Sequence, residues 1–434
     1  MTQTNNHIFA NHNDHLMEKV VEHSNLKKAL ERVESNKGSA GVDNMQVNEL
    51  RPYLKEHWMH IKQELLEGTY KPAPVRRVEI PKPDGGVRQL GIPTVLDRFI
   101  QQAIQQVLTP IFEPTFSDSS YGFRPGKSAR QAVHQAQIFI RQGKKIVVDI
   151  DLEKFFDRVN HDILMSKLAY SIQDKRILKI IRRYLQAGAM LNGCCVTSEE
   201  GTPQGGPISP LLANIMLNDL DQELTKRGHS FVRYADDCNI YVKSKRAGQR
   251  VYESISKFIK EKLKLKVNEQ KSAVDYPSRR KFLGFSFTTC WQVKLRVAPR
   301  TKLKFKARIR QLTSRNVSIS MQERLEKLNA YIIGWSGYFG IAETLSVFQE
   351  LDEWIRRRLR MCLLKQWKLC KTKLHCLVAL GIPEKWAGCI AFSRKKYWRL
   401  ANTPQINKAL GLAYWRKQGL VRLVDRYYEL LQSP

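Results

Sequence analysis

Two adjacent aspartates, Asp236 and Asp237, lie between two β-prone runs in the segment Phe231-Val-Arg-Tyr-Ala-Asp-Asp-Cys-Asn-Ile-Tyr-Val242. Because the flanking runs favour strands, the segment predicts a β-hairpin with both acids at its turn. Adjacent carboxylates repel each other unless a cation neutralises them, and hard oxygen ligands of this kind suit Mg²⁺. The pattern therefore indicates a metal site, although aspartate is also common in ordinary turns.

A third carboxylate would complete a two-metal site, in which ions about 3.5–4 Å apart activate a 3′-hydroxyl and stabilise a leaving pyrophosphate. The candidates lie in Ile146-Val-Val-Asp-Ile-Asp-Leu-Glu-Lys-Phe-Phe-Asp157, an apolar strand that ends in acids. Asp149 and Asp151 alternate onto one face of that strand, so the spacing lets either of them reach the metals. A solvated or helix-capping role is the alternative for Asp149, Glu153 and Asp157.

A cationic hairpin is predicted upstream, between Val75 and Pro93, where two β-prone runs flank Pro-Asp-Gly-Gly. The turn brings Lys82 and Arg88 near each other across the hairpin, where they could close on a triphosphate. Arg76 and Arg77 on the same ribbon are candidates for contact with template phosphates. An exposed basic hairpin without such a role is the alternative.

A loop rich in glycine and proline, Gly201-Thr-Pro-Gln-Gly-Gly-Pro-Ile-Ser-Pro210, precedes a helical run that begins at Leu211. Such a loop lets backbone N–H groups at a helix start approach a phosphate or a sugar closely. Loops of this composition are common, so the composition alone assigns no role.

These segments together resemble the motifs of reverse transcriptases. Asp-x-x-x-x-Phe-Phe and Tyr-Ala-Asp-Asp are similar to motifs A and C, and the family's spacing from aspartate to aromatic selects Asp151 and Phe156. The resemblance implies that Asp151, Asp236 and Asp237 bind two catalytic Mg²⁺ ions, for which Mn²⁺ can substitute. It also implies that Phe156 is the steric gate that excludes a ribose 2′-hydroxyl. An ordinary core aromatic is the alternative for Phe156.

Two further segments extend the resemblance around the nucleotide. Pro-Gln-Gly-x-x-x-Ser-Pro is similar to motif B, which implies that Gln204 and Gly205 lie beside the incoming nucleotide and the templating base. Leu265 to Ser272 resembles motif D, whose lysine, here Lys271, could protonate the departing pyrophosphate. A surface lysine is the alternative for Lys271.

Other blocks resemble the family outside the metal motifs. The hairpin with Lys82 and Arg88 resembles the fingers hairpin that binds dNTPs. Ser120-Tyr-Gly-Phe-Arg-Pro-Gly126 is similar to a block that lies ahead of motif A. Phe282-Leu-Gly-Phe285 looks like the palm–thumb junction, where Gly284 lets the backbone approach the primer closely.

The elements that must position these residues fall into four regions. Residues 1–75 are predicted to be an N-terminal helical extension, and 76–300 alternate β-rich runs with helical stretches, which indicates an α+β domain. Residues 301–380 are predicted to form long helices, and 381–434 form a small basic helical region. With the resemblance, this predicts a right-hand polymerase: fingers and a palm with an antiparallel sheet, a helical thumb (maturase domain), and a C-terminal DNA-binding region.

The chain carries 73 Lys+Arg against 41 Asp+Glu, a net charge of +32. The excess is concentrated near the C-terminus, with 16 against 6 in residues 301–380 and 10 against 3 in residues 381–434. Such a field attracts polyanions, so nucleic acid is the expected partner. Arg356, Arg357 and Arg358, which follow Trp354 on a predicted helix, are candidates for RNA contact. A basic surface that serves only solubility or anionic lipid is the alternative.

Other classes of protein are not indicated. No apolar run reaches the roughly 18 residues that a membrane span requires, and the N-terminus lacks a secretory pattern. The eight cysteines form no C-x-x-C pair, so neither a zinc site nor a disulfide framework is expected. A bacterial cytoplasm is the expected location, with association to the nucleoid when the protein acts on DNA.

The resemblance extends over roughly residues 20–430 and is closest to group II intron-encoded proteins of the compact, endonuclease-lacking type, similar to group IIC. It implies an RNA-directed DNA polymerase that copies intron RNA into cDNA and binds that RNA as a splicing maturase for retrohoming. The implied partners are intron RNA, an RNA template with a DNA primer, dNTPs and target DNA. The alternatives are an intron-free reverse transcriptase in repair or defence, and a non-catalytic RNA-binding splicing factor.

Overall fold

The computed structural model describes residues 15–81, 86–191, 194–196, 201, 205–290 and 292–432. The chain divides into two compact units, Met1–Tyr276 and Pro277–Pro434. The first unit contains the predicted helical extension, fingers and most of the predicted palm, and the second contains the predicted thumb and basic C-terminal region. The finer boundaries at residues 75, 300 and 380 stay predictions.

Three helices open the described part of the first unit: α1 (Leu16–Val20), α2 (His23–Asn36) and α3 (Leu50–Glu67). Helix α2 buries Ala29 and Val33, which are four residues apart and therefore lie on one helix face. It ends where Lys37 adopts a left-handed backbone conformation, with φ 45°. These helices confirm the helical character that was predicted for this region.

A mixed four-stranded sheet in the order β2-β1-β4-β5 follows. Its strands are β1 (Val75–Pro81), β2 (Val87–Ile92), β4 (Ala189–Leu191) and β5 (Cys194–Val196). Helix α4 (Val95–Phe112) begins at Thr94, whose hydroxyl accepts a hydrogen bond from the Asp97 amide. The Asp97 carboxylate is buried and accepts from Tyr70 Oη and from the Ala73 amide, which ties the approach to β1 onto α4. Burial raises the pKa of Asp97 despite these hydrogen bonds.

The second sheet has the order β6-β7-β3-β8 and is antiparallel throughout. Its strands are β3 (Ile146–Ile150), β6 (Ser230–Tyr234), β7 (Asp237–Val242) and β8 (Ala273–Asp275). The apolar strand predicted from Ile146 and the two β-prone runs predicted on either side of Asp236 and Asp237 fall on β3, β6 and β7. The predicted antiparallel palm sheet is therefore confirmed.

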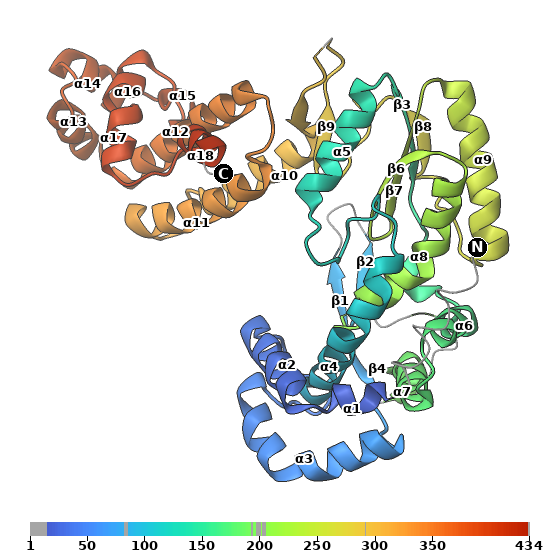
Figure 1. The fold of residues 1–434 in the computed structure, drawn as a ribbon. Coiled ribbons are helices and arrows are strands. Elements are labelled where there is room, and N and C mark those ends of the chain that lie inside the picture. Colours follow the sequence, from blue (N-terminus) through green and yellow to red (C-terminus); the bar gives the residue numbers. More distant parts are fainter. Residues whose placement is uncertain are drawn as a thin grey trace. The chain divides into compact units, whose positions relative to one another are not determined.

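Helices α5 (Ala129–Arg141), α8 (Ser209–Lys226) and α9 (Lys245–Lys262) contact the strands of this sheet, while α6 (His161–Ser171) packs on α8 and α7 (Lys175–Gln186) packs on α6 (Figure 1). Val148, Ile150 and Ile240 are fully buried on one face of the sheet, in the same apolar cluster as residues of α8 and α9. On the other face, Phe139 of α5 contacts Tyr241 of β7, with ring centroids 5.9 Å apart.

The second unit begins with a hairpin, β9 (Phe285–Phe287) and β10 (Leu295–Val297), and continues as helices. These are α10 (Pro299–Leu312), α11 (Met321–Phe339), α12 (Leu345–Gln366), α13 (Cys370–Ala379), α14 (Glu384–Ala391), α15 (Tyr397–Leu400), α16 (Pro404–Ala409), α17 (Leu412–Lys417) and α18 (Leu423–Gln432). Aromatic rings join the first helices, since Trp335 lies 4.4 Å from Phe305 and 6.1 Å from Phe348 between ring centroids. The predicted helical character of this region is confirmed.

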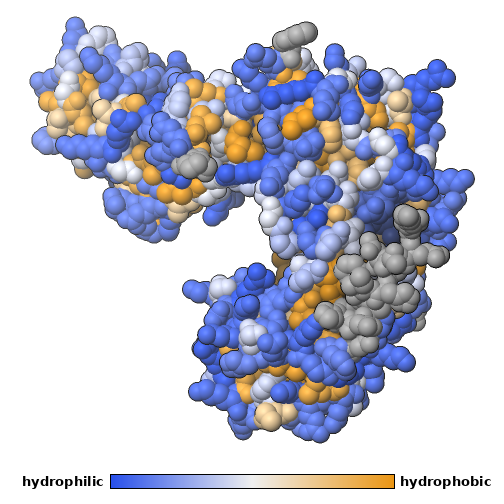
Figure 2. All heavy atoms as spheres, in the orientation of Figure 1, coloured by the Kyte–Doolittle hydropathy of each residue, from blue (hydrophilic) through white to orange (hydrophobic). Residues whose placement is uncertain are grey.

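Hydrophilic side chains cover most of the face drawn in Figure 2, with smaller apolar areas between them. Among the described residues, no helix combines the length and the apolar character that crossing a bilayer requires.

Candidate active site

The hairpin that carries Asp236 and Asp237 forms as predicted. Tyr234 pairs with Asp237 across β6 and β7, so Ala235 and Asp236 make the two-residue turn and Asp237 begins β7. Ala235 has φ 57°, a conformation that residues other than glycine rarely adopt. The turn therefore holds two carboxylates on a backbone that is strained at Ala235.

Strand register places the third acid at the same end of the sheet. Ile150, the last residue of β3, pairs with Cys238 of β7. Asp151 directly follows Ile150 and Asp237 directly precedes Cys238, so the two acids continue from this last pair at the same end of the sheet. Asp151 thus lies beside the turn that carries Asp236.

Asp149 occupies a different position in the ladder. It pairs with Asn239 on one side and Ala273 on the other, inside the sheet. Two residues along a strand correspond to about 6.6 Å, so Asp149 lies one step further from the turn than Asp151 on the same face. The register therefore favours Asp151, the choice that the family resemblance implied and that spacing alone left open.

The segment that resembles motif D holds the main chain of Asp151. The Asp151 amide donates to Ser272 Oγ at 3.0 Å, and the Asn268 amide donates to the Asp151 carbonyl at 2.8 Å. Leu152 and Val267 form an isolated antiparallel bridge beside these contacts. Lys271, which is exposed, is the neighbour of Ser272, so its backbone lies next to Asp151.

Phe156 lies in a 3₁₀ turn, Phe155–Asp157, that follows Asp151. It is half-buried and packs edge-to-face on Phe155, with ring centroids 5.1 Å apart. Gly201 packs against this turn, since a Cβ atom added to it would lie 2.9 Å from the Phe156 carbonyl oxygen. Its backbone φ is 96°. The start of the glycine-rich loop is therefore fixed against the segment of Phe156.

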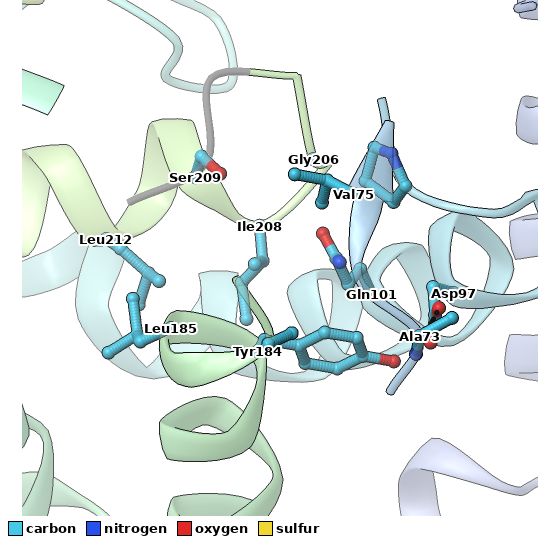
Figure 3. A pocket seen from close by; sticks show the side chains of 12 residues that line it. Ala73, Val75, Asp97, Gln101, Tyr184, Leu185, Gly206, Ile208, Ser209 and Leu212 are labelled. Carbon is cyan, nitrogen blue, oxygen red and sulfur yellow. Dashed lines mark hydrogen bonds between the residues drawn. The ribbon is translucent and has the colours of Figure 1, made fainter. Parts of the chain in front are cut away.

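The same loop also rests on the fingers sheet at Gly205. Gly205 has φ 135°, and a Cβ atom there would lie 2.5 Å from the carbonyl oxygen of Gly91 in β2. At Gly206 a Cβ atom would lie 2.2 Å from Oε1 of Gln101, whose amide points toward the loop in Figure 3. Gln204, the residue that motif B implicates at the nucleotide, lies outside the described residues.

A small cavity of about 20 Å³ lies beneath this loop, lined by residues of β1, α4, α7 and α8 (Figure 3). A cavity needs roughly 10–15 Å³ to hold one water molecule. One buried atom that lines it, Gln101 Oε1, has no hydrogen-bond partner in the part of the chain that the structure describes. The cavity is therefore large enough for one water molecule that could donate to this oxygen.

The fingers hairpin is confirmed as two antiparallel strands, β1 and β2. Arg88 pairs with Ile80, while Arg76 and Arg77 pair with Ile92 and Gly91. Lys82 lies outside the described residues, and of Arg88 only the backbone is described. The closeness of the Lys82 and Arg88 side chains stays a prediction.

The block from Ser120 to Gly126 packs directly behind the acidic turn, a contact that the sequence did not reveal. The Tyr121 amide donates to the Arg233 carbonyl at 2.8 Å, and the Arg233 amide donates to the Ser119 carbonyl at 2.9 Å. A Cβ atom at Gly122 would lie 2.3 Å from the Ala235 nitrogen, so only glycine fits there. The signal that could have suggested this packing is the glycine between two aromatic residues.

Cys238 follows the acidic pair but is no candidate metal ligand in this environment. Burial raises the pKa of its thiol well above the ordinary value, and the carboxylates of Asp221, Asp149 and Asp237 raise it further. Cys238 also lies on the face of β7 opposite Asp237, because successive residues of a strand point to opposite faces.

In the second unit, the residues that were predicted to touch nucleic acid are packed against other parts of the protein. Gly284 has φ 88°, and a Cβ atom there would lie 2.9 Å from the ring of Phe339. Arg357 donates to the Trp398 carbonyl and stacks over its ring at 3.9 Å, and Arg358 donates to Thr313. Arg356 is half-buried, and burial lowers the pKa of its guanidinium. RNA contact by these residues stays a prediction.

Among the described residues, no three His, Cys, Asp or Glu side chains converge as a finished set of metal ligands. The backbone nevertheless brings Asp151, Asp236 and Asp237 to one end of the sheet. On the same face, the buried Oδ1 of Asn239 has no hydrogen-bond partner in the described chain. Carboxylate and amide oxygens are the ligands that a divalent cation such as Mg²⁺ prefers.

Two family profiles match the chain. "Reverse transcriptase (RNA-dependent DNA polymerase)" matches residues 80–287, and "Group II intron, maturase-specific domain" matches residues 302–377. Protein YkfC of Escherichia coli K12 is 33% identical over 282 residues, which cover 56% of this chain and 74% of YkfC. Group II intron-encoded protein LtrA of Lactococcus lactis subsp. cremoris is 31% identical over 323 residues, which cover 59% of this chain and 54% of LtrA. The chain thus spans about half the length of LtrA.

Proposed function

We propose that this chain, which belongs to the group II intron reverse transcriptase family, is an RNA-directed DNA polymerase that also serves as a splicing maturase. It copies intron RNA into DNA and binds the same RNA. The observation that supports the proposal is the register of β3 and β7: Ile150 pairs with Cys238, so the neighbouring residues Asp151 and Asp237 lie at the same end of the sheet as the turn with Asp236.

Asp151, Asp236 and Asp237 hold the divalent cations, Mg²⁺ in the cell with Mn²⁺ as a substitute. All three offer hard carboxylate oxygens, the donor type that Mg²⁺ prefers. When bound, two such ions activate a 3′-hydroxyl and stabilise the leaving pyrophosphate. The protein's own contribution is to fix the three carboxylates at one end of a rigid sheet.

The remaining site residues bind and select the nucleotide. Phe156 presents its ring beside Asp151 and excludes a ribose 2′-hydroxyl, while Gln204 lies at the base and sugar. Lys82 and Arg88 bind the triphosphate from the fingers hairpin, since a guanidinium forms bidentate contacts with phosphate. Lys271, next to the segment that holds Asp151, supplies a proton to the leaving pyrophosphate.

Nucleic acids are the macromolecular partners. The net charge of +32 and the match to the maturase-specific domain support binding of intron RNA, an RNA template with its DNA primer, and target DNA. Arg76, Arg77 and Gly205 in the first unit, and Gly284 with Arg356, Arg357 and Arg358 in the second, are the proposed contacts. The protein acts in a bacterial cytoplasm and at the nucleoid when it acts on DNA.

The matched pair Asp151→Asn and Asp149→Asn tests the assignment. Each substitution removes one carboxylate while keeping the side-chain shape, within β3 for Asp149 and one residue after the end of β3 for Asp151. Loss of a metal ligand removes several kcal/mol of transition-state stabilisation, so Asp151→Asn should lower primer extension on RNA by about 1000-fold or more. Asp149→Asn should retain activity within about tenfold of wild type.

RNA binding, measured by filter retention, and assistance to splicing should survive in both variants, because they do not depend on the metal site. Full cDNA synthesis by Asp151→Asn would refute the site. Intron RNA binding by a wild-type chain that never extends a primer would instead favour the non-catalytic splicing factor.

A further inference from the structure

A buried guanidinium lies directly behind the acidic turn. Arg233, two residues before Ala235 on β6, and Asp221 of α8 are both fully buried. Arg233 Nε donates to Asp221 Oδ1 at 2.7 Å and Nη2 donates to Asp221 Oδ2 at 2.5 Å, a bidentate pair. Burial alone would lower the pKa of Arg233, but the Asp221 carboxylate outweighs it and the pKa lies above the ordinary value. The guanidinium is therefore charged.

The other N–H groups of Arg233 reach three separate segments. Nη1 donates to the Ala235 carbonyl at 2.8 Å and to Asn214 Oδ1 at 3.0 Å, and Nη2 donates to Ser120 Oγ at 2.8 Å. With the two bonds to Asp221, all five guanidinium N–H groups have an acceptor. Asn214 also donates to the Gly122 carbonyl at 2.8 Å, so the same network holds the segment that presses on Ala235.

Arg233 approaches the turn from the face opposite the Asp237 carboxylate. It pairs with Cys238, whereas Asp237 is the next residue and therefore points to the other face. The guanidinium thus cannot contact a nucleotide bound at the acids. It acts on the turn through the Ala235 carbonyl.

We propose that Arg233 is a positioning residue that holds the strained turn of Asp236 and Asp237 in the geometry that binds the divalent cations. This inference rests on the proposed function of the three aspartates. Positive φ at a residue other than glycine is unfavourable and persists only when its surroundings fix it. The hydrogen bond from Arg233 to the Ala235 carbonyl and the close packing of Gly122 on the Ala235 nitrogen fix this backbone conformation.

A buried ion pair with only a structural role is the competing explanation. Removal of one partner of such a pair is strongly destabilising, but replacement of both by apolar residues is often tolerated. The double variant Arg233→Met/Asp221→Leu therefore removes the bond to Ala235 without leaving a buried charge. Arg233→Lys keeps the charge beside Asp221 but loses the planar fork that reaches Ala235, Asn214 and Ser120 together.

Arg324 offers a matched control in the second unit. It is 2% exposed and donates to the carbonyls of Leu312, Ser314 and Val317, so Arg324→Lys disturbs an equally buried arginine far along the chain. These carbonyls lie at the end of α10 and in the connection between α10 and α11.

The test measures Mn²⁺ binding to the full chain by electron paramagnetic resonance, and primer extension as a function of Mg²⁺ concentration. Thermal unfolding identifies which variants fold. We expect the double variant and Arg233→Lys to need at least about tenfold more of either ion for half-saturation, a difference of about 1.4 kcal/mol, while Arg324→Lys stays within twofold of wild type. Excess Mg²⁺ should restore most of the extension rate, because no ligand has been removed.

Wild-type ion requirements in a folded double variant, or in a folded Arg233→Lys variant if the double variant does not fold, would overturn the inference. If both variants fail to fold while Arg324→Lys folds, Arg233 is a folding determinant and the inference is also overturned. A wild-type chain that binds no Mn²⁺ and extends no primer would refute the proposed function itself, a distinct outcome.

Discussion

Gly205→Ala tests whether the glycine-rich loop must rest on the fingers sheet for polymerisation. The backbone of Gly205 has φ 135°, and an added Cβ atom would lie 2.5 Å from the Gly91 carbonyl oxygen. That oxygen belongs to the main chain of β2, so it cannot rotate away as a side chain can. Either the alanine variant keeps a strained contact or the loop leaves β2.

The size of the effect follows from these two penalties. A residue other than glycine in a sparsely populated backbone region costs about 1–3 kcal/mol. Overpacking against fixed atoms adds about 1–3 kcal/mol. The alanine variant would therefore place the loop about 2–6 kcal/mol above its present position, which corresponds to a loss of roughly 30-fold to 10⁴-fold in the population of the productive arrangement.

Gly206→Ala is the natural control because it lies one residue away. Its Cβ atom would meet Oε1 of Gln101 at 2.2 Å, the far end of a flexible side chain. Gln101 can adopt another rotamer at about 0.5–1.5 kcal/mol, and Gly206 has no positive φ. We therefore expect kcat/KM for dNTP incorporation to fall at least about 30-fold in Gly205→Ala and less than about tenfold in Gly206→Ala.

Single-nucleotide primer extension on an RNA template gives kcat/KM, and thermal unfolding reports the fold. The melting temperature should change little in either variant, since a surface loop relaxes locally. Equal activity of Gly205→Ala and wild type would refute the reasoning. So would an equal loss in both glycine variants, because the two sites differ in what an added Cβ atom meets.

Three further substitutions or treatments test other parts of the structure. Phe156→Val should raise incorporation of ribonucleotides relative to dNTPs by about tenfold or more in competition assays. Unchanged discrimination between the two sugars would show that Phe156 is not the steric gate. The Asp352 carboxylate accepts hydrogen bonds from the Leu423 and Val424 amides at the start of α18. Asp352→Asn should therefore lower the stability of the second unit by about 1–3 kcal/mol in thermal unfolding and make α18 accessible to protease. Iodoacetamide at pH 8 should label the exposed Cys290 rapidly and Cys238 only after unfolding. Burial raises the pKa of the Cys238 thiol, and the thiolate is the reactive form. Equal labelling of both cysteines in peptide mapping would contradict the buried position of Cys238.

The palm sheet was predictable because its signals are local. Apolar runs on both sides of Tyr234 and Asp237 predicted the hairpin, and the apolar run before Asp149 predicted β3. The selection of Asp151 over Asp149 from the residues alone was not possible, because it depends on which residue of β7 stands opposite Ile150. Register between strands about 90 residues apart in the chain is set by packing that a single sequence does not display.

The role of Arg233 was hidden for a similar reason. An arginine in a strand favours a solvent-exposed position, and arginine is almost never fully buried unless it is paired. Its partners Ser120, Asn214 and Asp221 lie on other elements, the furthest of them 113 residues away in the chain. Each is an ordinary polar residue in its own segment, so only the folded structure identifies them as one network.

The residues that position the acidic site share one property: they form hydrogen bonds with main-chain atoms of Asp151 and Ala235. Ser272 and Asn268 bind the amide and carbonyl of Asp151, and Arg233 binds the carbonyl of Ala235. The carboxylate positions are therefore set through the backbone from two sides of the sheet. It follows that variants of these supports should change the affinity for divalent cations while leaving all three proposed ligands in place. Variants of the aspartates should instead remove activity at any ion concentration, so titration with Mg²⁺ separates the two classes.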